Sequence, residues 1–245
     1  MHDAITVYVL IVVFGATLIR STLGFGEALI AVPLLAVRLP ITVAAPLAVL
    51  VSVVIAAFVV IQDWRHVELR SAASLLLAAL PGIPLGVFLL ARSNEHVLKS
   101  ILGVLIIAFS MYSLTIGRSR HLPNDHRGWL VTCGFLSGFL GGAYGMNGPP
   151  LAIYGALRRW QPRHFRATLQ AYFLPASLCG LVGYAYLGLW QRALTRYFLL
   201  CLPVVTVAIL LGRAINQRMT GQRFFSFVFV GLIAVGCILV LQASK

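Results

Sequence analysis

Long apolar segments, separated by short basic patches, constrain the fold of this chain more than any other feature of its sequence. Because a segment in lipid must satisfy its own backbone polar groups, and none shows the alternation of a barrel strand, the spans are predicted to be helices. Most of them approach or reach the ~20 residues that cross a ~30 Å hydrocarbon core. The sequence therefore predicts an all-α, multi-pass membrane protein with eight to ten transmembrane helices, in the cell inner membrane. Ten apolar segments are found, at about residues 4–19, 28–37, 41–61, 72–91, 97–116, 129–145, 148–157, 167–188, 195–212 and 224–241.

The charge pattern supports a membrane setting and argues against nucleic acid as a partner. Hydrophobic residues make up 60% of the 245 residues and charged residues 10%, and the net charge is +13. The basic residues are scattered over the connectors, as expected for loops that meet anionic lipid headgroups and fix topology. If all ten segments cross, 13 of the 19 Lys and Arg fall on one side, which predicts ten crossings with both termini outside. An eight-span arrangement, in which two short segments fold back, stays open.

Two of the segments, 28–37 and 148–157, are about ten residues long and would reach only ~15 Å as helices. They are the second and the seventh of the ten, which indicates an internal duplication with repeats at 1–120 and 121–245. An offset of 119 residues superposes Gly26 on Gly145. Five segments per repeat is an odd number, so the two repeats are predicted to be inverted relative to each other.

Each short segment follows a stretch that should break a helix, "GFGEALIAVP" in the first repeat and "GMNGPP" in the second. Unwound backbone at membrane depth is tolerated where it lines a cavity, and paired breaks of this kind point to a transporter's binding site. Proline suits the first turn of a helix, Asn147 is a candidate N-cap, and the positive helix ends favour an anion. The alternative is that the glycines serve close helix packing. The candidate substrate-binding residues at the breaks are Gly24, Gly26, Gly145, Asn147, Gly148 and Pro149.

Two charged residues near the breaks are further candidates. Glu27 is the one acid of six that falls inside an apolar segment, which makes it a candidate proton carrier. It could instead cap the following helix, and Arg20 could pair with it or serve as the counter-charge of an anion. Arg166 is a candidate substrate-facing cation at the cavity mouth, because guanidinium binds sulfonate or carboxylate oxygens bidentately. Its alternative role is that of a basic topology anchor.

The remaining reactive side chains predict no enzyme, no cofactor and no metal site. Five histidines lie in connectors and one at the terminus, and the four cysteines lie in apolar segments without C-x-x-C spacing. A catalytic site needs more than one isolated intramembrane acid. A transporter of small anions is therefore favoured, and an anion channel or a membrane-embedded accessory subunit is the alternative.

The two break regions resemble the signature regions of the TauE/SafE sulfite exporter family, also called the 4-toluene sulfonate uptake permease family. The first is "GFGEALIAVPLL", and the second combines "GGAYGMNGPPLAIY" with the following "PRHFRAT". The resemblance covers the whole chain and implies a permease for sulfite, sulfonates or related organic anions, coupled to protons or another ion. Glu27 and Asn147 depart from it, since family members commonly carry glycine there. A homodimer is left open.

Overall fold

The chain folds into helices joined by short connectors, as the apolar segments predict. The structure is a computed structural model that describes residues 2–23, 26–115, 127–158, 162–216 and 222–243. Within these ranges no strand occurs, so the all-α class is confirmed. The helices are α1 (His2–Leu23), α2 (Glu27–Ala36), α3 (Ile41–Asp63), α4 (Leu69–Ala79), α5 (Gly82–Arg92), α6 (Glu95–Thr115), α7 (Arg127–Tyr144), α8 (Gly148–Leu157), α9 (Pro162–Tyr186), α10 (Arg192–Asn216) and α11 (Gln222–Ala243), with a 3₁₀ turn, η1 (Trp64–His66), after α3.

Each predicted segment corresponds to one helix, except the fourth. The segment predicted at 72–91 is divided into α4 and α5, which are bent by 46° relative to each other. Pro81 lies at the bend and has no N–H to continue the hydrogen-bond ladder, which explains why the span does not run straight. The predicted segment therefore counts as one span only when the bent pair is taken together, and the bend itself was not predicted.

Several helices are long and apolar enough to cross a membrane. In the described part of the chain, α1, α3, α6 and α10 meet this condition, and the bent pair α4–α5 makes a fifth span if it is counted as one. The protein is thus a multi-pass membrane protein. The short helices α2 and α8, of 10 residues each, are half the length that a crossing requires.

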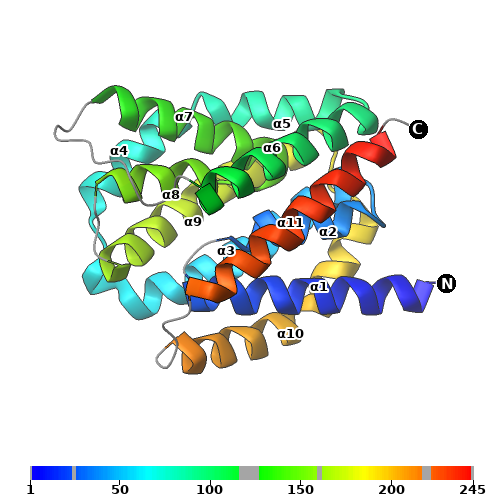
Figure 1. The fold of residues 1–245 in the computed structure, drawn as a ribbon, viewed down its shortest axis with the longest axis horizontal. Helices are drawn as coiled ribbons and strands as arrows, with labels where there is room; N and C mark the ends of the chain where they lie inside the picture. Colours follow the sequence, from blue (N-terminus) through cyan, green and yellow to red (C-terminus); the bar gives the residue numbers. More distant parts are fainter. Residues whose placement is uncertain (1, 24–25, 116–126, 159–161, 217–221, 244–245) are drawn as a thin grey trace.

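The helices run broadly along the long axis of the molecule, and both termini lie at the same end (Figure 1). Four packing relationships dominate the bundle: α1 lies against α10, α7 against α4 and α5, α3 against α9, and α6 against α11. The pair α3–α9 passes through the centre and carries fully buried side chains such as Leu47 and Tyr172. This arrangement places the starts of α2 and α8 next to the central pair.

Candidate functional site

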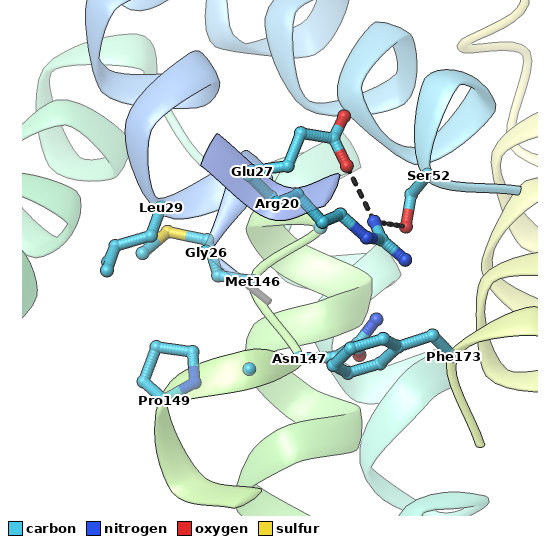
Figure 2. A pocket seen from close by; sticks show the side chains of 12 residues that line it. Arg20, Gly26, Glu27, Leu29, Ser52, Met146, Asn147, Pro149 and Phe173 are labelled. Carbon is cyan, nitrogen blue, oxygen red and sulfur yellow. Dashed lines mark hydrogen bonds and ion pairs between the residues drawn. The ribbon is translucent and has the colours of Figure 1, made fainter. Parts of the chain in front are cut away.

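The two helix breaks meet at one small pocket. It is lined from α1, the start of α2, α3, the break before α8, and α9 (Figure 2). About 20 Å³ of it is open to the centres of water-sized molecules, so it is large enough to hold water. The lining residues are Arg20, Gly26, Glu27, Ala28, Leu29, Ser52, Gly145, Met146, Asn147, Gly148, Pro149 and Phe173.

Glycine makes both breaks through the same backbone conformation. Gly26 precedes α2 with φ 97°, and Gly145 follows α7 with φ 68°. Residues other than glycine rarely adopt this left-handed backbone conformation, because their Cβ atom then crowds a neighbouring carbonyl. The Gly145 N–H bonds the Gly141 carbonyl at 2.8 Å, which caps α7 and turns the chain toward α8. The predicted break at Gly24 lies outside the described residues.

The two helix starts differ in the donors they can offer an anion. Every residue in the first turn of α2 has a backbone N–H, whereas Pro149 and Pro150 leave only Gly148 and Leu151 with one in the first turn of α8. The prediction that Asn147 caps α8 is wrong for the same reason, since a cap bonds the N–H of the second or third helical residue and both are proline.

Asn147 is instead held from two sides. Its backbone carbonyl accepts a hydrogen bond from Ser137 Oγ at 2.7 Å, and Ser137 Oγ also lies 3.0 Å from the Tyr172 hydroxyl. Its side-chain amide lies against Gly141, where any Cβ would overlap Asn147 Oδ1. Asn147 is 5% exposed, so these contacts fix a buried polar side chain at the pocket.

Arg20 is the central charge of the pocket. Its Nη1 donates to Glu27 Oε2 at 2.6 Å and to Ser52 Oγ at 2.5 Å, and its Nη2 donates to Gln170 Oε1 at 2.6 Å. The guanidinium carbon lies 5.2 Å from the Phe173 ring centroid, within cation–π range. Figure 2 shows the guanidinium between Glu27 and Ser52 on one side and Phe173 and Asn147 on the other. Arg20 is 4% exposed and Glu27 2%, so this is a buried ion pair.

Two polar atoms of the pocket residues have no hydrogen-bond partner among the described residues. They are Arg20 Nε and Asn147 Oδ1. Buried polar atoms are nearly always paired, and leaving one unpaired costs about 1–3 kcal/mol. An unpaired donor on a buried cation is suited to an oxyanion.

The predicted site residues divide into those that the pocket includes and those that it does not. Gly26, Glu27, Gly145, Asn147, Gly148 and Pro149 all line it, whereas Arg166 does not. Arg166 lies on α9 one turn before Gln170. Ser52, Gln170 and Phe173 were not among the site residues predicted from the sequence. A signal was present for the first two, since each is a polar residue well inside a long apolar segment.

The comparison with known proteins decides the family. The family described as Sulfite exporter TauE/SafE matches residues 9–239. The chain belongs to this family.

Two curated relatives cover almost the whole chain. A Cupriavidus necator protein named "Probable sulfite/organosulfonate exporter TauE" is 25% identical over 94% of this chain and 91% of its own length. A Bacillus subtilis protein named "Probable membrane transporter protein YunE" is 22% identical over 96% of this chain and 98% of its own length. No solved structure matches the chain. Membership of the TauE/SafE family makes the protein a membrane transporter and not an enzyme.

Proposed function

We propose that this protein moves small sulfur oxyanions, sulfite or an organosulfonate, across the membrane through the pocket where α2 and α8 begin, with net flux coupled to protons. The observation that carries the proposal is the buried guanidinium of Arg20 beside two helix N-termini in one pocket. Positive helix ends and a guanidinium both favour oxyanions. The name of the Cupriavidus necator relative supports the same substrate class.

The packing of the helices supports two repeats that alternate around this site. If α1 corresponds to α7 and the α4–α5 pair to α10, then the contact of α1 with α10 corresponds to that of α7 with α4 and α5. The pairs α3–α9 and α6–α11 then each join equivalent helices. Such an exchange of partners is expected of a twofold relation between repeats 1–120 and 121–245, and rocking of one repeat against the other would expose the pocket to each side in turn.

Counterflow in liposomes tests this function. Vesicles that contain the purified chain and unlabelled sulfite, taurine or methanesulfonate inside should take up the same labelled anion transiently from outside. We expect flux to saturate with concentration and to compete among the anions that bind. Flux that stays linear with concentration, with no counterflow overshoot, would indicate a channel; absence of flux for every anion would refute the proposal.

A further inference from the structure

We propose that the transported anion replaces the Glu27 carboxylate as the partner of Arg20, and that Glu27 takes up one proton in the same step. This inference rests on the proposed function and names the residues that couple anion to proton. In the empty site the Glu27 carboxylate occupies the position on Arg20 that the anion's oxygens take in the loaded site. The proton comes from the solution on the side to which the pocket is open.

The hydrogen bonds of Arg20 show what an anion can gain there. Ser52 and Gln170 fix the two terminal nitrogens without neutralising them, and Glu27 supplies the one negative charge, through Nη1. Arg20 Nε has no partner in the described part of the chain, so an oxyanion could add a bond to it. The Asn147 side chain also lines the pocket, and its Oδ1 lies against Gly141, so the N–H₂ group is the end that can donate to the same anion.

The contacts of Arg20 favour replacement over addition. Its Nη1 already donates to Glu27 Oε2 and Ser52 Oγ, and its Nη2 to Gln170 Oε1, so an incoming oxyanion gains a terminal nitrogen of the guanidinium only where the Glu27 carboxylate leaves it. Movement of the Glu27 side chain away from Arg20 would free the volume of a carboxylate, a group close in size and charge distribution to the one that enters.

Charge balance explains why a proton should accompany the anion. Arg20 and Glu27 are the ionisable residues that line the pocket, and together they are neutral. An anion that displaced Glu27 while it stayed ionised would leave two negative charges beside one positive charge in a buried site, at a large desolvation cost. Protonation of Glu27 restores neutrality, and the proton leaves when the carboxylate returns to Arg20.

In the described structure, no other charged group near the pocket can neutralise Arg20 in place of Glu27. Helix α2 packs against α1, α3, α6 and α11. The charges at the start of α6 form their own pair, Lys99 with Glu95 at 2.9 Å, and the described side chains of α11 carry none. On α9, Arg166 engages other partners and does not line the pocket. One monovalent anion and one proton therefore move together, and an outward anion gradient drives both outward.

Thermal unfolding of the purified full-length chain in detergent tests the displacement. Methanesulfonate is the probe, because it stays ionised over the pH range used, and sulfite is run beside it. E27Q leaves Arg20 without its counter-ion, so we expect a lower Tm without anion and a larger anion-induced rise than in the wild type, at about tenfold lower anion concentration. R20Q/E27Q replaces the pair by two amides and should unfold near the wild-type Tm with no anion-induced rise. E95Q removes the carboxylate of the other ion pair and should match the wild type.

Flux in liposomes tests the coupling on the same variants. With the anion on both sides, E27Q should exchange it at least as well as the wild type. With a pH gradient alone, the wild type and E95Q should accumulate methanesulfonate on the alkaline side, and E27Q should not. Because one charge of each sign moves, a membrane potential alone should drive no accumulation.

The outcomes separate the two proposals. If the wild type exchanges neither probe, the proposed function and this inference both fall. If the wild type exchanges a probe but E27Q binds it no more tightly, or still accumulates it in a pH gradient, the displacement of Glu27 is refuted and the transport function stands.

Discussion

At the scale of single residues, the pocket depends on side chains that are held in place by neighbours outside it. Ser137 fixes the Asn147 backbone, and the absence of a side chain at Gly141 leaves room for the Asn147 amide. Tyr184 further ties this turn of α7 to α9, because its hydroxyl donates to the Gly142 carbonyl at 2.8 Å. The amide that faces the pocket is therefore set by packing behind it.

A methyl group at position 141 should change anion binding without touching the anion. In Gly141→Ala the new Cβ overlaps Asn147 Oδ1, and the amide has to leave its position. Loss of one hydrogen bond to a charged ligand costs about 1.5–3 kcal/mol, so we expect the KM for the transported anion to rise at least roughly tenfold. Concentration-dependent counterflow measures this.

Gly180 provides the matched control for this substitution. It also lies in a helix, and a Cβ there meets nothing within 4 Å. Gly180→Ala should keep the wild-type KM. An unchanged KM in Gly141→Ala would show that the position of the Asn147 amide does not matter for binding.

At the scale of helices, glycine has two distinct uses in this chain, and the amino-acid sequence alone is compatible with both. At Gly26 and Gly145 it permits a left-handed turn at the breaks, as the paired motifs predict. At Gly142 it permits close packing, because a Cβ there would overlap the Ile83 carbonyl of α5. Spacing alone could not assign these uses, since both patterns are glycine-rich stretches in an apolar segment.

Local sequence predicted more of the helices than of the contacts between them. Apolar length and Gly/Pro breaks are local, so the two half-length helices are confirmed. Glu27 could also be predicted from local sequence, because it is an isolated acid inside an apolar segment. The bond between Arg20 and Gln170 joins residues 150 positions apart, and no local pattern specifies it. The bend at Pro81 was missed because that segment is as apolar as its neighbours.

The left-handed breaks predict a graded response to substitution. Alanine at position 26 has open space around its Cβ and should cost only the backbone strain, about 1–2 kcal/mol. Asparagine tolerates this conformation, so Gly26→Asn should cost less than Gly26→Ala. Gly145→Ala should cost most, since its Cβ would also lie 2.8 Å from Val49 Cγ2. Thermal unfolding in detergent measures the order.

Gly15 in α1 is the control for this series, because no atom lies within 4 Å of a Cβ there and its φ is not positive. Gly15→Ala should unfold at or slightly above the wild-type temperature. The same Tm for Gly26→Ala and Gly15→Ala would contradict a left-handed backbone at the first break.

At the scale of the whole molecule, the short helices decide the topology. If α2 and α8 each cross the membrane, the loop after each of them lies on the other side of the membrane from the break before it. Both termini then lie on the same side of the membrane. The termini do lie at the same end of the molecule (Figure 1). An eight-span chain also has both termini on one side, so their positions do not discriminate between the two arrangements.

Two connectors do discriminate, because one of the two short helices, α8, lies between them, so the number of crossings from one connector to the other is even if α8 crosses and odd if it does not. Asn94, between α5 and α6, and Gln191, between α9 and α10, are both exposed. The stretch between them contains α6, α7, α8 and α9. Counted with α8 it makes four crossings and returns the chain to the same side; counted without α8 it makes three and ends on the opposite side.

Single cysteines at these positions, in a chain whose four native cysteines are replaced, give the last prediction. With ten crossings and the basic connectors in the cytoplasm, Asn94→Cys and Gln191→Cys should both react with a membrane-impermeant maleimide in intact cells. Arg65→Cys, in the connector after α3, should react only after the membrane is permeabilised. If Asn94→Cys and Gln191→Cys differ, α8 does not cross, whichever way the protein is inserted. If both are protected and Arg65→Cys reacts, ten crossings hold with the opposite orientation, and the bias of Lys and Arg does not set the topology of this chain.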